Sequence, residues 1–414
     1  MQKMNNLYLH QTTLIELNPS KHLLAWSCGS GKTRTSIELA LKNCERVLVV
    51  CPKALKENWR REIEKWSERF DGSTVFKVVS KEEFRRDWED LEGADGIIID
   101  EAHFFSGITS QMHKNMVKYL TRNMVQYRWL LTATPYMSSA WNIYGLAAVL
   151  GTKWNYMSFK NKFFFDIRMG SRVIPKQREG IEEEIGKLVA GLGSTVKLED
   201  CFDVPEQNFE TEYFALTAEQ KKEIKAIDLS ADPHIVRWTR IHQVLGGYLK
   251  GDEYNPGRKI DCDKLERVRE LAGENPQMMV VSRYVGEIHA IKEVLEADGR
   301  YVGVISGDIK GKQAVLDDLK SRGNYVLIVS AGCSEGWELP ECPLMVFYSY
   351  DFSLKSYIQI MGRIQRAGHI KKNTYLSLIV SGTIDEDVFK CVTINKSDFH
   401  LAIYNDRSGL PDKI

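Results

Sequence analysis

The eight residues Ser27-Cys28-Gly29-Ser30-Gly31-Lys32-Thr33-Arg34 lie between a short apolar run, His22–Trp26, and a helical pattern over Thr35–Leu41. This order is that of a strand, a glycine-rich turn and a helix. Glycines let backbone N–H groups turn inward around a phosphate, and the N-terminus of a helix adds partial positive charge at the same point. Lys32 is then placed to reach the β- and γ-phosphates of a nucleotide, and the Thr33 hydroxyl to hold Mg²⁺. The stretch therefore predicts a nucleotide-binding phosphate loop.

One position departs from the usual pattern of such loops. Trp26 stands where the first glycine normally falls, while the core Gly-x-Gly-Lys-Thr is intact. An ordinary glycine-rich turn has a similar composition, so the surrounding sequence has to distinguish the two. We expect the nucleotide contacts to come from Cys28, Gly29, Ser30, Gly31, Lys32, Thr33 and Arg34.

Length and composition set the class of protein. A chain of 414 residues is too long for one ordinary hydrophobic core, so two or three domains are expected. Its apolar content of 43% is that of a soluble globular protein, and no run reaches the ~18 consecutive apolar residues of a membrane span. The N-terminus lacks the apolar core of a signal peptide. We therefore expect an intracellular protein that does not act on a membrane.

Charge and cysteine content narrow the partners. The chain has 56 basic and 56 acidic residues, which argues against a protein coated in basic surface. A basic groove for nucleic acid can nevertheless coexist with an acidic face elsewhere. The eight cysteines include no Cys-x-x-Cys pair and no Cys/His group with zinc spacing. We expect reduced thiols and no structural zinc.

Strand and helix patterns alternate over residues 23–150. Apolar runs at 47–51, 75–79, 96–100 and 128–134 are separated by amphipathic helical spacing, which indicates a parallel sheet wrapped by helices. Residues 151–250 break this rhythm. There we expect helical insertions and a connector, with a flexible stretch at Gly191-Leu192-Gly193.

A second strand and helix series begins near residue 262, without a second phosphate loop. The fold class is therefore α/β, with two tandem domains. The strands of the second series are expected at 278–282, 302–305, 325–329, 344–348 and 374–379.

Asp100-Glu101-Ala102-His103 directly follows the apolar run Ile97–Ile99. A carboxylate at the carboxyl end of a parallel strand faces the crevice where such sheets bind ligands. Asp100 is then placed to hold Mg²⁺, and Glu101 to orient and deprotonate an attacking water. A solvated acidic turn after a buried strand is the alternative, and the phosphate loop upstream favours the catalytic reading.

Gln359, Arg363 and Arg366 are spaced at i, i+4 and i+7, so a helix would carry them on one face. Two arginines and an amide in one stripe suit a triphosphate approached across a cleft. Arg363 and Arg366 would then stabilise charge on the phosphoryl group in transfer, which is the role of an arginine finger. An exposed basic helix face is the alternative.

The order of the motifs resembles a superfamily-two helicase, and more narrowly the Snf-type (Swi/Snf-related) DNA translocases. The likeness covers nearly the whole chain. It rests on the phosphate loop, the Asp-Glu-Ala-His motif and the Gln-Gly-Arg-Arg segment, and on Val47–Trp66, Leu130–Pro135 with Trp141–Tyr144, Leu216–Gln220 and Gly382–Glu386.

This resemblance implies two RecA-like domains, each a parallel sheet flanked by helices, with boundaries expected at 1–205, 206–255 for a helical connector, and 256–414. It implies ATP and Mg²⁺ as cofactors, with Thr33 and Asp100 on the metal and Glu101 on the water. It also matches Gln11 to the glutamine that reads adenine.

Candidates for coupling ATP to nucleic acid follow from the same resemblance and from loop positions. The loop near Gly336 is one residue shorter than in Snf-type relatives. The candidates are Lys53, His103, Thr132, Thr134, Ser282, Arg283, Ser330, Gly336 and Gln359.

The function expected from these motifs is that of an ATP-dependent DNA translocase, hydrolysing ATP at the cleft between two domains to move along or remodel duplex or branched DNA. A strand-separating or branch-migrating helicase of recombination and repair, an RNA-dependent unwinding ATPase and a non-enzymatic regulator are the alternatives. The compact length suggests a phage or viral source, or a stand-alone motor. The bacterial cytoplasm and the nucleus both stay open as its location.

Overall fold

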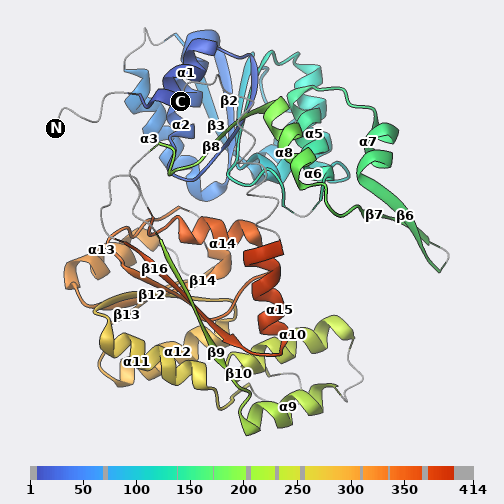
Figure 1. Ribbon diagram of the computed structural model, residues 1–414. Coiled ribbons are helices and arrows are strands. Elements are labelled where there is room, and N and C mark those ends of the chain that lie inside the picture. The colour runs from blue at the N-terminus through green and yellow to red at the C-terminus, as the bar shows by residue number, and fades with distance from the viewer. Residues whose placement is uncertain are drawn as a thin grey trace. The chain divides into compact units, whose positions relative to one another are not determined.

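The computed structural model describes residues 7–68, 73–137, 139–170, 172–201, 207–228, 233–251, 257–307, 311–333, 336–365 and 372–395 (Figure 1). Chain contacts divide the protein into two compact units. The first comprises residues 1–203 together with 396–414, and the second comprises residues 204–395. The predicted boundaries at 205 and 255 stay a prediction, and each unit is described by itself.

A six-stranded sheet in the order β3-β2-β4-β5-β1-β8 forms the centre of the first unit, and every neighbouring pair is parallel. The predicted parallel sheet is confirmed. Its strands are β1 (Lys21–Trp26), β2 (Arg46–Cys51), β3 (Val75–Ser80), β4 (Gly96–Asp100), β5 (Tyr127–Leu131) and β8 (Gly193–Val196).

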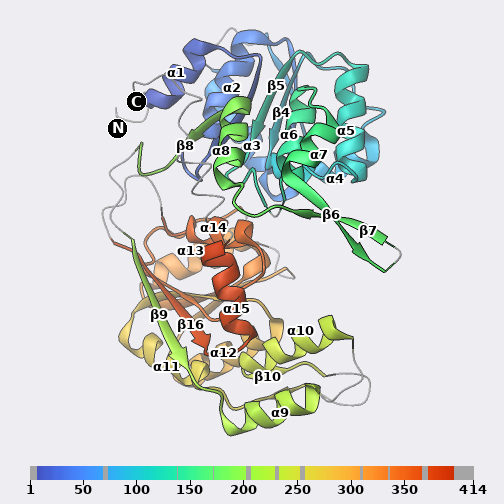
Figure 2. The same ribbon diagram turned by 45° about the vertical axis from the view of Figure 1, so that its right-hand side comes forward.

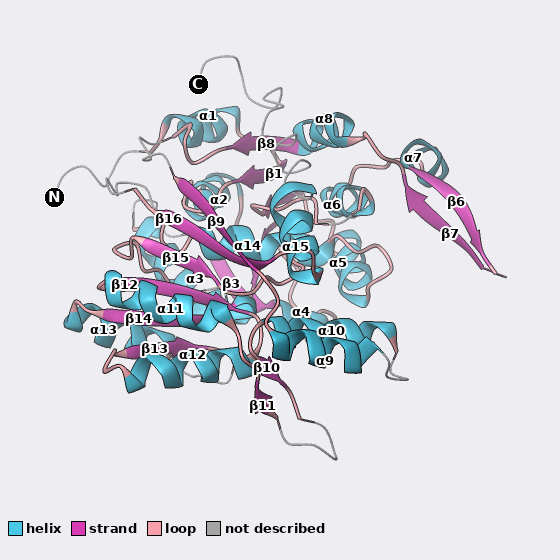
Figure 3. Ribbon diagram, turned by 60° about the horizontal axis from the view of Figure 1, so that its bottom comes forward, coloured by secondary structure: helices cyan, strands magenta, loops and turns pink. Residues whose placement is uncertain are grey.

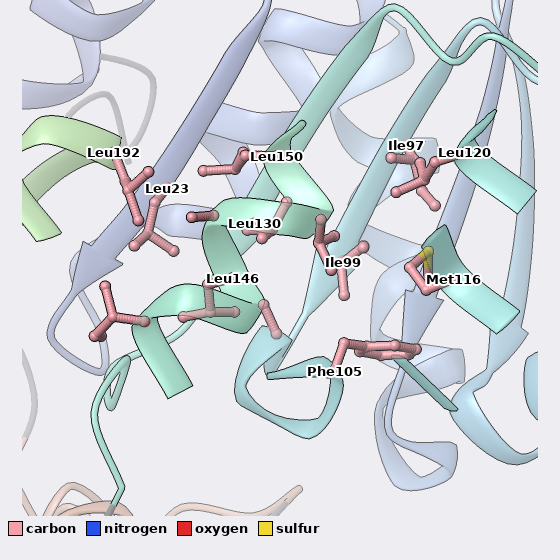
Figure 4. Packing of buried hydrophobic residues seen from close by; sticks show 14 of the residues in the cluster. Leu23, Ile97, Ile99, Phe105, Met116, Leu120, Leu130, Leu146, Leu150 and Leu192 are labelled. Atoms are coloured by element: carbon pink, nitrogen blue, oxygen red, sulfur yellow. The ribbon is translucent and has the colours of Figure 1, made fainter. Parts of the chain in front are cut away.

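Alternate residues of these strands fill two cores, one on each face of the sheet. Leu23, Ile99 and Leu130 point into one core, while Leu24 and Trp129 point into the other. Figure 4 shows the first core, where strand side chains meet those of α5, α6 and α8. The helices of this unit are α1 (Leu9–Leu17), α2 (Lys32–Asn43), α3 (Lys56–Ser67), α4 (Lys81–Asp87), α5 (Gln111–Arg122), α6 (Trp141–Leu150), α7 (Tyr156–Phe163) and α8 (Glu182–Leu192).

The stretch expected to be flexible, Gly191–Gly193, instead closes helix α8 and opens the edge strand β8. Gly193 packs so tightly on Leu23 that a Cβ atom would collide with the Leu23 backbone. The next residue, Ser194, accepts a 2.8 Å hydrogen bond from the Trp26 indole. Trp26, the departure from the usual loop pattern, therefore anchors the edge strand beneath the phosphate loop.

A hairpin of two antiparallel strands, β6 (Phe164–Met169) and β7 (Arg172–Gln177), extends from the first unit beyond α5 and α6 (Figure 2). It differs from the purely helical insertions expected for residues 151–250. Residues 165–169 of β6 do alternate between apolar and polar side chains, but β7 has the run Val173-Ile174-Pro175, which breaks the alternation and places a proline inside the strand. The hairpin was therefore not recognised as a pair of strands.

The second unit also has a six-stranded sheet, in the order β13-β14-β12-β15-β16-β9, again parallel throughout. Strand β9 lies in the stretch expected as a helical connector, and its seven residues pair with β16 along its whole length. The strands are β9 (Asn208–Phe214), β12 (Gln277–Ser282), β13 (Val302–Ile305), β14 (Tyr325–Ser330), β15 (Leu344–Phe347) and β16 (Thr374–Val380).

Helices cover both faces of this second sheet (Figure 3). Helices α11 and α12 pack on one face, and α13, α14 and α15 on the other. A short antiparallel pair, β10 (Tyr248–Leu249) and β11 (Arg258–Lys259), completes the unit. The helices are α9 (Ala218–Asp228), α10 (His234–Leu245), α11 (Asp263–Glu274), α12 (Val285–Ala297), α13 (Lys312–Arg322), α14 (Leu354–Met361) and α15 (Ile384–Lys390).

A buried ion pair joins α11 to α15 in the second unit. The Lys264 ammonium donates to Asp385 Oδ2 at 3.0 Å and to the carbonyls of Tyr348 at 2.7 Å and Leu378 at 3.2 Å. His242 Nε2, from α10, lies 3.4 Å from the other carboxylate oxygen. Burial alone would raise the pKa of Asp385, but Lys264 and His242 hold that pKa at about 2. The buried Lys264 ammonium and the Asp385 carboxylate thus compensate each other's charge, which buried ions require.

We predict that Lys264→Met lowers the opening free energy of the second unit by about 3–5 kcal/mol, because the Asp385 charge is left buried and unpaired. Hydrogen exchange at the amides of β16 measures this change without assuming that both units unfold together. Lys259→Met, which breaks an exposed pair with Glu293, is the matched control and should cost less than about 1 kcal/mol.

The pH dependence has a definite sign. The pKa of Asp385 in the folded protein lies below the ordinary value of 3.8. The stabilisation of the second unit by the Asp385 charge is therefore fully present above about pH 4 and is lost as the pH falls toward 2. Equal losses in Lys264→Met and Lys259→Met would contradict the assignment.

Candidate functional site

The predicted phosphate loop connects the end of β1 to the start of α2. Gly29 and Gly31 have φ angles of +80° and +86°, a left-handed backbone that favours glycine. Gly31 is also the N-cap of α2, which begins at Lys32. The loop thus opens directly onto the free N–H groups of a helix N-terminus, which is an arrangement suited to an anion.

Lys32 folds back over this loop. Its ammonium donates to the carbonyls of Trp26 at 2.7 Å and Ser27 at 2.9 Å. Ser30 is buried and donates to the same Ser27 carbonyl, at 2.7 Å. Lys32 and the loop backbone therefore bring positive charge and N–H donors to one place.

Cys28, Thr33 and Arg34 occupy different surroundings in the loop. Cys28 is half-buried, and Thr33 lies in the first turn of α2. Arg34 pairs with Glu38 at 2.8 Å, and its guanidinium lies 4.0 Å from the centre of the Trp66 ring. Arg34 is thus bound along its own helix and against α3.

Helix α1 supports the loop from outside. His10 Nε2 lies 2.8 Å from the Ser30 carbonyl oxygen, and Gln11 Nε2 donates to Gly31 O at 3.0 Å and to Thr35 Oγ1 at 3.1 Å. The Gln11 oxygen accepts from the Tyr8 N–H at 2.9 Å. Gln11 thus clamps the loop, and its predicted contact with adenine stays a prediction. The sequence pattern missed the role of His10.

Asp100 ends β4 and is held at both oxygens. Oδ2 accepts from the Trp59 indole at 2.8 Å, and Oδ1 accepts from the Glu101 N–H at 2.9 Å. Burial, together with the neighbouring Glu101 charge, raises the pKa of Asp100 to about 6, although Trp59 and Lys32 act in the opposite direction. Sequence spacing can indicate that Trp59 is buried, but it cannot reveal the hydrogen bond from its indole to Asp100.

These residues fit a nucleotide-bound Mg²⁺. A carboxylate with a raised pKa has an anion that its surroundings stabilise poorly, and a nearby cation would correct this. Carboxylate and hydroxyl oxygens are the ligands that Mg²⁺ prefers. Asp100 and Thr33 would hold the ion.

Glu101 has a φ of +50°, which is uncommon for a residue with a Cβ atom. Its Oε2 lies 3.1 Å from His103 Nδ1, and the same nitrogen lies 3.2 Å from Thr132 Oγ1. Thr132 Oγ1 in turn accepts from the Thr134 N–H at 3.0 Å. The acidic motif and the Thr-Ala-Thr-Pro motif therefore form one chain of contacts.

The stripe expected in the second unit is corrected. Helix α14 ends at Met361, so Gln359 lies on the helix but Arg363 lies in the turn that follows. Arg363 Nε donates to Gln359 O at 3.0 Å and its Nη1 donates to Trp337 O at 2.8 Å. The spacing was compatible with a continued helix, but Gly362 ends it in tighter turns. Arg366 lies outside the described residues.

The remaining candidates are placed as follows. Lys53 is exposed at the start of a 3₁₀ turn after β2. Ser330 ends β14 opposite Ser282 of β12, and Gly336 has a left-handed φ of +81°. The Ser282 hydroxyl, the group that could bind phosphate, is buried and donates a hydrogen bond to Glu287 Oε2 at 2.6 Å.

Arg283, the residue that follows β12, is better placed than Ser282 to contact a phosphate. Its side chain is half-buried, and its guanidinium lies 4.7 Å from the centre of the Phe352 ring. Nη1 lies 4.0 Å from Asp351. Arg283 therefore keeps charge near the surface, whereas Ser282 supports the fold.

Two absences concern the described ranges only. Within them, no three His, Cys, Asp or Glu side chains gather as metal ligands do. Among the helices given above, none is both long enough and apolar enough to cross a bilayer.

Two family models match the chain. An SNF2-related domain matches residues 76–245, which contain Asp100 and Glu101 but begin after the phosphate loop. A helicase conserved C-terminal domain matches residues 263–368, which contain Arg363.

Relatives cover most of the chain at low identity. Chromodomain-helicase-DNA-binding protein 1-like of Mus musculus is 23% identical over 428 residues, which are 89% of this chain and 46% of the relative. The ISWI chromatin-remodeling complex ATPase ISW1 of Saccharomyces cerevisiae is 23% identical over 482 residues, which are 97% of this chain and 40% of the relative. The chain thus spans less than half the length of these relatives.

One solved structure, the Sulfolobus solfataricus SWI2/SNF2 ATPase core in complex with dsDNA, is 19% identical to the chain with a TM-score of 0.41. The match covers 97% of this chain and 94% of that one.

We predict that Trp59→Phe weakens binding of Mg²⁺ with a fluorescent ATP analogue by roughly tenfold or more, since a lost hydrogen bond to a charged group costs about 1.5–3 kcal/mol. Trp66→Phe is the control, because it removes an indole hydrogen bond on the same helix, to Glu62 at 2.8 Å. Titration of the analogue with and without Mg²⁺ is the measurement. A Trp59 effect that persists without Mg²⁺ would show that the indole acts on the fold rather than on the metal site.

Proposed function

We propose that this chain is a DNA-stimulated ATPase that translocates on or remodels DNA. It joins an SNF2-related domain to a helicase conserved C-terminal domain, and so belongs to the SNF2-type helicases, as its motifs predicted. The observation that carries this proposal is the continuous contact from Glu101 through His103 to Thr132, beside the phosphate loop. The names of the two relatives, a DNA-binding helicase and a chromatin-remodeling ATPase, support DNA as the partner.

The first unit would supply the hydrolytic chemistry. Backbone N–H groups of the loop and the Lys32 ammonium bind the phosphates of ATP. Thr33 and Asp100 hold Mg²⁺, which supplies charge neutralisation when bound. Glu101 takes a proton from the attacking water, and His103 keeps its carboxylate oriented.

The second unit would supply the arginine fingers. The Arg363 carbonyl accepts a hydrogen bond from the Leu339 N–H, and its guanidinium donates to the Trp337 carbonyl. These contacts hold Arg363 against the loop that follows β14. We place Arg363 and Arg366 on the γ-phosphate, where their charge counts most in the transition state. Alternation between closed and open units would then move DNA along the protein.

We predict that Lys32→Ala abolishes ATP turnover, because the ammonium that meets the phosphates is removed. Turnover should be measured side by side with single-stranded DNA, duplex DNA, branched DNA and RNA. Lys42→Ala, on the last turn of the same helix, is the control and should retain turnover. Strongest stimulation of the wild-type chain by RNA would overturn the choice of DNA, and strongest stimulation by branched DNA would favour the branch-migrating helicase.

We predict that Glu101→Gln slows hydrolysis by about 10²–10⁴-fold while the chain still binds ATP, since only the base is lost. Single-turnover hydrolysis and analogue binding separate the two steps. Glu92→Gln, an exposed carboxylate of the same unit, should leave both unchanged. Loss of ATP binding in Glu101→Gln would refute its assignment as the base.

A further inference from the structure

The hairpin β6–β7 has an excess of basic over acidic residues, whereas the whole chain has equal numbers of the two. Residues 164–178 contain four basic side chains and one acidic one. The acidic one, Asp166, is paired with Lys160 of α7 at 2.9 Å. Arg168, Arg172 and Lys176 are exposed and have no acidic partner among the described residues. These exposed cations are therefore available to bind an anionic partner.

Apolar side chains accompany these charges. The register places Lys176 opposite Phe165, and Ile167 opposite Ile174, so these residues share one face with Arg172. Phe165 and Ile174 are 39% and 41% exposed. A two-stranded ribbon cannot bury such a face by itself. Basic and apolar groups together fit a polymer that offers both phosphates and flat, weakly polar sugars and bases.

The spacing of the charges suits a nucleic-acid strand. Arg172 and Lys176 are four residues apart on β7, which is about 13 Å along a strand. Four steps of one DNA strand advance by about the same distance along the helix axis. The two cations can therefore contact separate phosphates of one strand.

The base of the hairpin is fixed to the first unit. Phe164 is buried and stacks on Trp141 with ring centres 4.7 Å apart. At the other strand, Gln177 accepts from the Ala140 N–H at 2.7 Å and donates to the Tyr136 hydroxyl at 2.8 Å. A force on the hairpin is thus transmitted to residues 136–141.

Tyr136 connects this base to the catalytic motif. It lies two residues after Thr134, whose N–H donates to Thr132, and Thr132 contacts His103 beside Glu101. The path from Gln177 to Glu101 is therefore built from adjacent residues and short polar contacts. No other described hairpin has a comparable connection to the acidic motif.

We propose that the hairpin β6–β7 binds the DNA backbone and conveys DNA occupancy to Glu101 through Gln177, Tyr136 and the Thr132–Thr134 turn. This inference rests on the proposed function, since it names the contact by which DNA stimulates the ATPase. Arg172 and Lys176 act as DNA contacts, and Tyr136 acts as a positioning residue.

The binding part is tested with the double variant Arg172→Glu/Lys176→Glu of the full chain. Binding to a labelled duplex DNA is followed by fluorescence anisotropy without ATP, between 50 and 200 mM salt, as roughly the range over which phosphate contacts are resolved. We expect affinity to fall by about tenfold or more, and the slope of log affinity against log salt to fall by about 2, one for each lost cation. Lys114→Glu/Lys118→Glu, on α5, makes the same charge change and should bind as the wild type does.

The coupling part is tested with Tyr136→Phe, which removes the hydroxyl that accepts the hydrogen bond from Gln177 and keeps the ring. We expect the dissociation constant for DNA to stay within about twofold of the wild type, while the ratio of turnover with DNA to turnover without it falls several-fold. Tyr127→Phe, on β5, is the matched control. If Tyr136 had only a structural role, Tyr136→Phe would lower the unfolding midpoint and the DNA affinity together.

The two proposals fail separately. If the wild-type chain binds DNA and is stimulated by it, but both double variants bind alike, the hairpin proposal is overturned and the proposed function stands. If the wild-type chain binds DNA through the hairpin without stimulation of turnover, the proposed function and the coupling are overturned while the contact stands. Binding of duplex RNA in place of DNA would overturn the choice of partner.

Discussion

Parallel hydrogen bonding places β5 between β1 and β4 in the first sheet, and all three strands run the same way. Their carboxyl ends therefore lie at one edge of the sheet. The phosphate loop follows β1, Asp100 ends β4, and Thr132 follows β5, so three separate sequence motifs are brought together by strand order alone. Without this pairing, the Glu101–His103–Thr132 contacts could not form, because 29 residues separate His103 from Thr132.

Two buried aspartates show how different surroundings shift the pKa of a carboxyl group in opposite directions. Burial with a neighbouring Glu101 raises the pKa of Asp100 to about 6, whereas Lys264 and His242 hold the pKa of Asp385 at about 2 against the same effect of burial. Asp385 is already compensated by the protein, and its removal should damage the fold. Asp100 is not, and this deficit is what a metal ion would correct. The direction of each shift thus agrees with the role that the contacts assign.

The sequence predicted those parts of the fold that depend on local residue patterns, namely the buried strands and the glycine-rich loop. Buried strands such as β2 and β4 are continuous apolar runs, and the glycine-rich loop has a backbone that only glycine adopts readily, so both could be recognised locally. Strands β8 and β9 were missed because neither contains a continuous apolar run: β8 has the four residues Gly-Ser-Thr-Val, and β9 has polar residues at four of its seven positions. A second limit applies to Trp59 and Arg363. Their hydrogen bonds depend on where distant backbone and carboxylate atoms lie, and no spacing encodes that.

The proposed function requires a physical connection between DNA and the group that activates water. On the proposed path, Glu101 adopts a left-handed backbone that is unfavourable for a residue with a Cβ atom. Its carboxylate lies beside His103, and His103 lies beside Thr132, so a small movement of the turn over 132–136 would reorient the Glu101 carboxylate. Closely packed cores do not deform gradually but shift between discrete arrangements. A hairpin whose base is fixed to that turn by Gln177 and by the stacking of Phe164 on Trp141 is therefore well suited to select one arrangement over the other.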